Sequence, residues 1–83
     1  MNKDCIESAY CFFHQKFRVY KYSNLEWQKD DIEYAISEYV DAMDRDLYNF
    51  LSNNKKSYLQ DHINFYNDIE LAIKNLNKLI NRK

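Results

Sequence analysis

Glycine and proline are both absent from the 83-residue sequence. The chain therefore lacks the residue that most readily adopts positive φ angles and the residue that most often breaks helices. Two-residue hairpin turns rely mainly on Gly, Asn and Asp, and the sequence contains no Asn-Gly or Asp-Gly pair. Sheets with tight hairpins are therefore disfavoured, and a helical protein is expected.

The sequence also lacks a long apolar run, because no segment approaches the ~18 apolar residues that span a membrane. A positively charged leader followed by an apolar stretch is not visible, and Lys3, Asp4 and Glu7 stand near the start. Cys5 and Cys11 would lie about 9 Å apart along one helix and on different faces, which excludes a disulfide between them. These features predict a cytoplasmic protein that does not enter membranes.

Signatures of catalysis and of metal binding are missing as well. Without glycine there is no Gly-rich phosphate loop, and no serine stands in a context that would activate it. His14 and His62 belong to no Glu-x-x-His or His-x-x-x-His pair, and the apolar spacing around His62 favours a hydrogen-bonded core residue. A chain this short has little core to give up for a deep ligand cavity. We therefore expect no enzyme activity, no cofactor and no metal.

Aromatic and charged residues are abundant instead. The chain holds eight Tyr, five Phe and ten Asn, a bias that AT-rich codons alone can produce. The number of tyrosines is therefore no sign of function, although the position of one tyrosine can be. The net charge of −1 conceals an uneven distribution, because eight acids and two bases between Leu25 and Ser52 give −6, whereas the rest of the chain gives +5. The centre of the chain is thus acidic against a basic remainder.

Apolar spacing predicts three helices, at about residues 5–22, 25–52 and 58–80, in a single domain over residues 1–83. The apolar positions of the central helix recur in steps of three and four: Ile32, Ile36, Tyr39, Met43, Leu47 and Phe50. Twenty-eight residues at about 1.5 Å each would make this helix roughly 42 Å long. The third helix has an equally regular seam: Tyr58, His62, Phe65, Ile69, Ala72, Leu76 and Leu79.

Helix boundaries follow from local polar signals. Residues 23–26 and 57–60 each fit a capping box, which would open the second and third helices. Trp27, in the first turn of the second helix, can close the core at one end of a bundle or anchor a partner, and core closure is the commoner role of such a ring. Short connections force neighbouring helices to be antiparallel. The predicted architecture is therefore all-α, an up-down-up three-helix bundle with a long central helix.

The predicted central helix carries a stripe of carboxylates opposite its apolar face. This candidate partner-binding surface consists of Glu26, Asp30, Glu33, Tyr34, Asp41, Asp44 and Tyr48. The acids repel one another, and only Lys29 and Arg45 stand nearby to reduce that cost. Acids one helical turn apart are about 6 Å from each other, comparable to successive phosphates on a nucleic-acid strand. A basic groove built for nucleic acid would attract such a row, and tyrosine adds contact area at low entropic cost.

These observations predict a small, non-enzymatic protein-protein interaction module with a basic protein partner. Inhibitors, immunity proteins and antitoxins, as encoded by phages and other mobile elements, are classes that would be built in this way. The simpler explanation is that the stripe is only the solvated face of a bundle helix. Direct nucleic-acid binding is disfavoured. The predicted bundle places Lys55 and Lys56 at the end opposite Arg82 and Lys83, so that the basic residues do not form one patch: Lys55, Lys56, Lys74, Lys78, Arg82 and Lys83. No helix-turn-helix or zinc-finger motif accompanies them.

The first helix carries a second apolar stripe that includes Phe12, Val19 and Tyr22, on the side opposite its main stripe. A helix that is apolar on two sides requires two partners. Either this helix is wedged between the other two, or a second copy of the chain covers the stripe. The alternative function is thus a homodimer or larger helical bundle, with Phe12, Val19 and Tyr22 in the interface.

Overall fold

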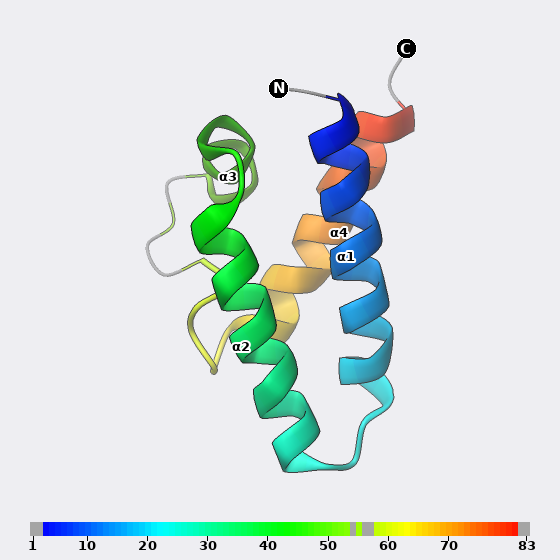
Figure 1. Ribbon diagram of the computed structural model, residues 1–83, viewed down its shortest axis with the longest axis vertical. Helices are drawn as coiled ribbons and strands as arrows, with labels where there is room; N and C mark the ends of the chain where they lie inside the picture. The colour runs from blue at the N-terminus through cyan, green and yellow to red at the C-terminus, as the bar shows by residue number, and fades with distance from the viewer. Residues whose placement is uncertain (1–2, 54, 56–57, 82–83) are drawn as a thin grey trace.

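The computed structural model describes residues 3–53, 55 and 58–81. It contains four helices: α1 (Lys3–Tyr22), α2 (Glu26–Ala42), α3 (Arg45–Ser52) and α4 (Phe65–Asn81) (Figure 1). Within the described residues there is no strand. The all-α class is confirmed, and the helices pack as a bundle. Among these four helices, none combines the length and apolar character required to cross a bilayer.

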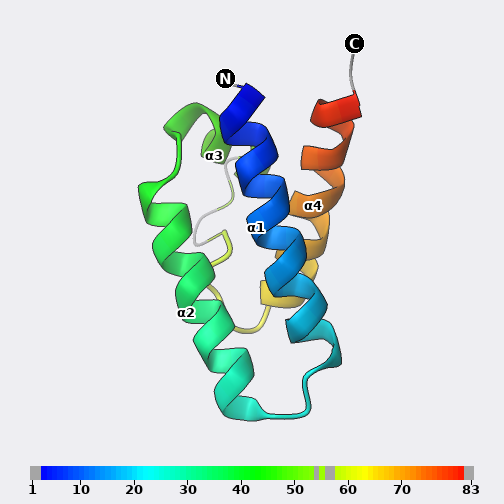
Figure 2. The ribbon, with the colours of Figure 1, turned by 45° about the vertical axis from the view of Figure 1, so that its right-hand side comes forward.

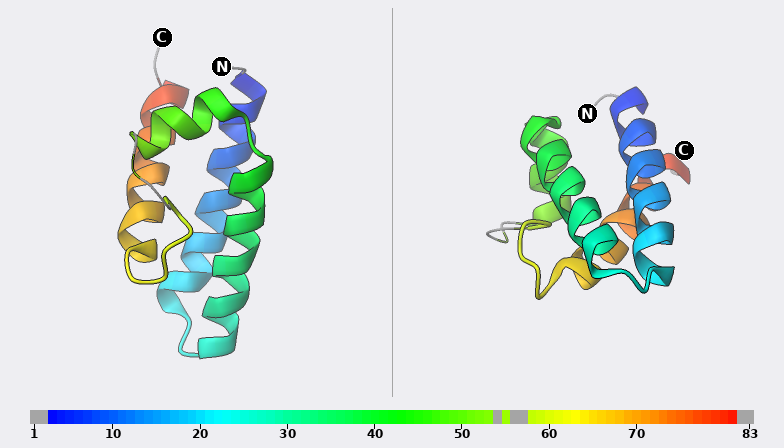
Figure 3. Two further views of the ribbon diagram at one scale, coloured as in Figure 1. Left: turned by 90° about the vertical axis from the view of Figure 1, so that its left-hand side faces the viewer. Right: turned by 60° about the horizontal axis from the view of Figure 1, so that its bottom comes forward.

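Three of the helices run side by side, and the fourth crosses one end. α1 and α2 form a hairpin, and α4 lies along α1 in the opposite direction (Figure 2). α3 leaves the end of α2 and runs across the top of the bundle toward α4 (Figure 3, left). The start of α1 and the end of α4 therefore lie at the same end of the molecule (Figure 1).

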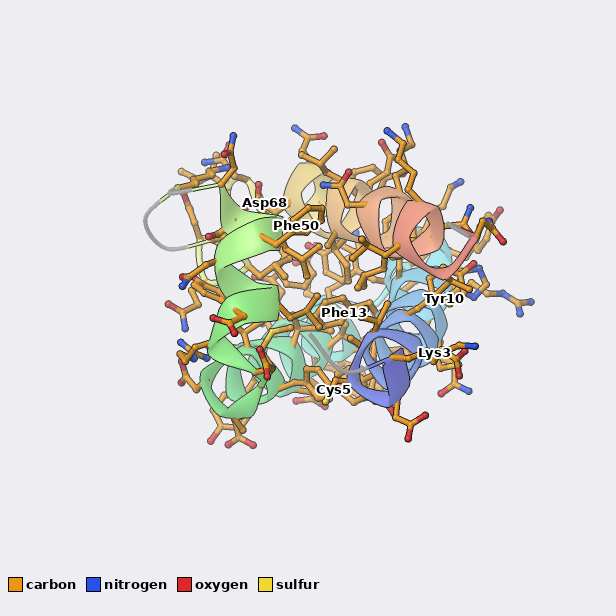
Figure 4. The ribbon with its side chains drawn as sticks, turned by 90° about the horizontal axis from the view of Figure 1, so that it is seen from above. Lys3, Cys5, Tyr10, Phe13, Phe50 and Asp68 are labelled. Carbon is orange, nitrogen blue, oxygen red and sulfur yellow. The ribbon has the colours of Figure 1, made fainter. Side chains whose placement is uncertain are left out.

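One apolar core joins all four helices and the segment between α3 and α4. Its buried residues are Ala9, Phe13, Tyr20, Ile32, Ile36, Val40, Leu47, Leu51, Tyr58, Leu59, Phe65, Ile69, Ala72 and Leu76. Phe13 lies in the interior between the helices when the bundle is seen from above (Figure 4). Because the core draws on every helix, each helix depends on the others for its stability.

The prediction of one continuous helix over residues 25–52 is wrong, because the helix is interrupted at Met43 and Asp44, between α2 and α3. Asp44 caps the N-terminus of α3, where its side chain accepts a hydrogen bond from the Leu47 backbone N–H at 3.0 Å. The Arg45 guanidinium donates to the backbone carbonyls of Val40, Asp41 and Met43 at the end of α2. The adjacent side chains of Asp44 and Arg45 therefore provide hydrogen-bond partners for backbone groups at the start of α3 and at the end of α2. No glycine or proline is needed to interrupt the helix.

The third predicted helix starts later than expected, at Phe65 rather than at residue 58. Residues 58–60 and 62–64 form turns, and Leu59 adopts a left-handed backbone conformation with φ 62°. Asp68 of α4 holds this segment in place: its carboxylate accepts from Lys55 Nζ at 2.7 Å and from the Leu59 N–H at 3.3 Å, and its backbone carbonyl accepts from the Tyr58 hydroxyl at 3.1 Å. Tyr58 is thus a core residue, as predicted, but it lies in a turn.

The two predicted capping boxes do not open helices. Ser23 Oγ accepts from the Leu25 N–H at 3.1 Å and donates to Gln28 Oε1 at 2.7 Å, and Leu25 is the N-cap of α2 without a side-chain cap bond. The second box includes Ser57, which lies outside the described residues, and α4 begins beyond it. Trp27 is 62% exposed and therefore does not close the core as predicted.

Candidate functional site

Glu33 of the predicted acidic stripe joins three separate parts of the fold. Its Oε2 accepts a hydrogen bond from the Tyr20 hydroxyl of α1 at 3.0 Å. The His62 Nδ1 lies 2.8 and 2.9 Å from its two carboxylate oxygens. The Glu33 side chain is 16% exposed, whereas that of His62 is 70% exposed. His62 is therefore a surface residue paired with a carboxylate, and the prediction that it is a core residue is wrong.

The pKa values of both partners of Glu33 are raised, that of His62 mainly by Glu33 itself and that of Tyr20 mainly by burial. The hydrogen bond and the charge of Glu33 raise the pKa of His62, with smaller contributions from Asp30 and Glu26. Burial, followed by the hydrogen bond to Glu33, raises the pKa of Tyr20 to about 12. The neutral phenol of Tyr20 and the protonated imidazole of His62 are thus the forms that this cluster favours.

A metal ion would find its best set of ligands in the same cluster. Asp30, Glu33 and His62 each offer one ligand atom, and these atoms lie within 4.8 Å of one another. However, the Glu33 oxygens already accept hydrogen bonds from Tyr20 and His62. A hydrogen-bonded ion pair explains this geometry without a cation.

The remaining predicted acids are divided between structural roles and free exposure. Asp44 caps α3, and Asp41 accepts a hydrogen bond from Gln60 Nε2 at 2.8 Å while remaining exposed. Glu26 and Asp30 are exposed. The ion pairs among the described residues are Lys55 with Asp68, His62 with Glu33, and Lys74 with Glu70. No acid on α2 is therefore paired with a lysine or arginine of the described chain.

The two tyrosines of the predicted surface have different surroundings. Tyr34 is 68% exposed on α2, and a hydrogen bond to the Glu38 side chain, together with its charge, raises the pKa of Tyr34. Tyr48 lies on α3, half-buried, with its ring edge-on to Tyr58 at 6.2 Å and the Arg45 guanidinium 4.9 Å from its centroid. The break after α2 thus removes Asp44 and Tyr48 from the α2 stripe. Four of the predicted residues stay exposed on α2, namely Glu26, Asp30, Tyr34 and Asp41, and exposed Glu38, which was not predicted, lies among them. We call these five residues the acidic α2 surface.

The second stripe of α1 is only partly exposed. Phe12 is half-buried and stacks on Tyr39 of α2, with ring centroids 4.4 Å apart and planes at 12°. Val19 and Tyr22 are 44% and 75% exposed. Val19 and Trp27 line one groove of about 330 Å³ between α1 and α2. Phe12 therefore contributes to the fold of the single chain, whereas Val19, Tyr22 and Trp27 remain open to a partner.

A groove between α1 and α4 gathers basic residues from both helices. Its volume is about 440 Å³, and its lining residues are His14, Phe17, Arg18, Lys21, Tyr22, Glu70, Ile73 and Lys74. We call it the basic groove. The spacing of His14, Arg18 and Lys21 was a signal that these three residues share one face of a helix. Only the packing of α4 against α1 adds Lys74 to that face.

Comparison with known proteins adds no family: no protein-family model, no curated protein and no solved structure matches this chain. Cys5 and Cys11 are both exposed and unbridged, in agreement with the predicted absence of a disulfide between them.

Proposed function

We propose that this protein is a small, non-enzymatic protein-protein interaction module that binds a basic partner through the acidic α2 surface. The observation that carries the proposal is that the carboxylates of this surface form no ion pair with any lysine or arginine among the described residues. An inhibitor, immunity protein or antitoxin that acts on a nucleic-acid-handling protein in the cytoplasm is the class that this surface fits best.

The shape of this surface fits a partner that contains a positively charged groove. α2 has 17 residues and is therefore about 26 Å long. Glu26 and Asp30 are one helical turn apart, and exposed Tyr34 follows one turn later. A helix that presents negative charges at regular intervals matches a positively charged groove and accelerates encounter with it. Tyr34 adds an amphipathic ring of the type that is enriched at the centres of protein interfaces.

The test is capture of the partner from the native host extract by the full chain, followed by mass spectrometry. The surface variant is Glu26→Lys with Asp30→Lys, and the matched control is Glu7→Lys with Asp46→Lys, which reverses two other exposed acids. Glu26 and Asp46 both stand in the first turn of a helix, so the two variants carry similar dipole costs. Circular dichroism checks the fold of each.

We expect the wild type and the control to retain the same basic protein, and the surface variant to lose it. Retention of that protein by both variants would place the binding surface elsewhere. Tyr34→Ala should weaken capture without abolishing it, because it removes contact area and leaves the charges in place.

A second candidate function is self-association through α1, and the exposure of Val19, Tyr22 and Trp27 favours it. Phe12→Glu would disturb the Tyr39 contact within the chain, so Val19→Glu is the cleaner variant. In sedimentation at micromolar concentration, we expect the wild type to exceed the monomer mass and Val19→Glu to be monomeric. A monomeric wild type would rule out this candidate.

A further inference from the structure

The basic groove contains three side-chain cations and little to neutralise them. Lys74 Nζ lies 3.9 Å from the Glu70 carboxylate, and both side chains are substantially exposed. Arg18 and Lys21 form no ion pair among the described residues. Cations that converge on one groove create a positive potential that an anion relieves. The groove therefore favours an anionic ligand, although the whole chain carries a net charge of −1.

The walls of the groove are aromatic and apolar. Tyr22 is 75% exposed, and Lys21 Nζ lies 5.6 Å from the centroid of its ring. Phe17 and Ile73 are partly buried and pack against the core. His14 stacks on Tyr10, with centroids 5.5 Å apart and planes at 20°. A planar ring of a ligand can thus rest on aromatic surface while its charged group meets the cations.

Cations beside an exposed aromatic ring are the arrangement that recognises the phosphate and base of a nucleotide. The volume of about 440 Å³ lies within the range of roughly 300–1,000 Å³ that is common for small-ligand sites. Inorganic phosphate would use only the cations, and an apolar ligand only the walls.

We propose that the basic groove binds a nucleoside phosphate, with the phosphate held by Arg18, Lys21 and Lys74 and the base resting against Tyr22. The ligand is either a free nucleotide or one unit of a single-stranded nucleic acid, since both present the same chemistry. All lining residues belong to α1 and α4, so the site does not depend on the acidic α2 surface. Arg18 and Lys21 of α1 join Lys74 of α4 in this groove, a grouping that only the packing of the two helices creates.

The experiment is titration of the ¹⁵N-labelled full chain at low salt, followed by NMR chemical-shift mapping. The probes are adenosine monophosphate, ribose 5-phosphate, which lacks the base, and adenosine, which lacks the phosphate. We expect the monophosphate to shift the amides of the groove and to bind about tenfold more tightly than either fragment. A ten-residue deoxyadenosine strand separates the two sources: tighter, steeply salt-dependent binding in the groove identifies a strand, and equal affinity identifies a free nucleotide.

Matched variants connect the signal to the proposed residues. The groove variant is Arg18→Gln, Lys21→Gln and Lys74→Gln, and the control removes three other positive charges with Lys3→Gln, Lys29→Gln and Lys78→Gln. We expect the groove variant to lose at least tenfold in affinity and the control to change less than threefold. Tyr22→Ala should reduce the affinity for the monophosphate to that for ribose 5-phosphate.

Three results would overturn the proposal. One is the absence of groove shifts at millimolar monophosphate, and another is an equal loss of affinity in the groove variant and the control. The third is binding of ribose 5-phosphate as tightly as the monophosphate, which would show that the groove recognises charge and not the base. Because these measurements use no protein partner, their failure leaves the proposed function of the acidic α2 surface unaffected.

Discussion

The pair of helices α1 and α4 and the described residues between Met43 and Asn64 (43–53, 55 and 58–64), called the segment below, are stabilised by different kinds of contact. α1 and α4 meet through fully buried apolar residues and through ring contacts, such as Tyr20 with Phe65 at 4.9 Å and Phe17 with Tyr66 at 5.2 Å. The segment depends in addition on a few polar side chains, chiefly Asp44, Arg45 and Asp68. Burial is non-directional and distributed, whereas a hydrogen bond depends on two particular groups.

This difference governs how the two regions respond to substitution. Loss of one apolar side chain from the helix pair removes area from a core that all the helices share, so the whole fold is affected. Loss of one polar group from the segment leaves a specific partner unsatisfied, and the cost depends on how deeply that partner is buried. Substitutions in the shared core should therefore cost more than substitutions of single polar groups in the segment.

Phe13→Ala should have the largest effect, because Phe13 is 0% exposed at the centre of the core. Truncation of a buried phenylalanine costs about 3–5 kcal/mol, which is most of the stability of a chain of this size. Thermal unfolding followed by circular dichroism should show a largely unfolded protein at 37 °C. The control is Phe50→Ala, at a position that is 46% exposed, and it should retain a cooperative transition. Similar behaviour of the two variants would contradict the proposed core.

Asp68→Ala should destabilise the protein by about 2–3 kcal/mol, because it removes the acceptor for Lys55 and for the Leu59 N–H in a buried environment. The Lys55 side chain is 44% exposed, and water therefore recovers part of the loss. Urea unfolding measures the change in free energy. Lys55→Met is the informative companion, since it leaves the Asp68 charge buried without its cation. If both variants match the wild type, Asp68 does not hold the segment.

Asp44→Ala should cost about 1 kcal/mol, the usual value for loss of an N-cap. Asp44→Ser should recover most of that loss, because a hydroxyl can accept the bond from the Leu47 N–H. Urea unfolding again gives the free energies. A variant with Ala at this position that is as stable as the wild type would mean that the chain breaks here for another reason.

The smallest effect is expected from pH, through the pair of His62 and Glu33. The pKa of His62 is raised in the folded protein, so the pair contributes its full stabilisation below the unfolded value of about 6.5. The contribution is lost as pH rises through the higher folded pKa. Thermal unfolding from pH 5 to pH 9 should show this loss in the wild type and not in His62→Gln. An NMR titration of His62 at or below pH 6.5 would refute the shift.

The sequence predicted those parts of the fold that depend on repeated apolar spacing. The all-α class, the course of α1 and the seam of α4 from Phe65 onward follow from positions that recur every three or four residues. The break at Asp44 could not be found in this way, because Asp and Arg are also ordinary residues of a helix surface. Likewise, Asp68 directly precedes the seam residue Ile69 and is polar, and only the folded chain shows which backbone groups it binds.

For the candidate surfaces too, the sequence shows which residues share one helix but not which residues of different helices lie together. Glu26, Asp30 and Tyr34 share one helix and are exposed there, as helical spacing predicted, whereas the end of α2 at Ala42 separates Asp44 and Tyr48 from them. Glu33 could not be distinguished from its neighbours, since its partners Tyr20 and His62 come from distant parts of the sequence. The basic groove was missed for the same reason, as it needs residues from the first and the last helix.

The bonds made by Glu33 have one more consequence. This carboxylate, on α2, contacts both Tyr20 of α1 and His62 in the turn before α4, so it links three parts of the fold. A protein partner that binds the Glu33 carboxylate must first break its contact with His62 and so release that turn from α2. The affinity of such a partner for α2 would consequently increase in mildly alkaline buffer, because the unprotonated His62 imidazole releases the Glu33 carboxylate more readily.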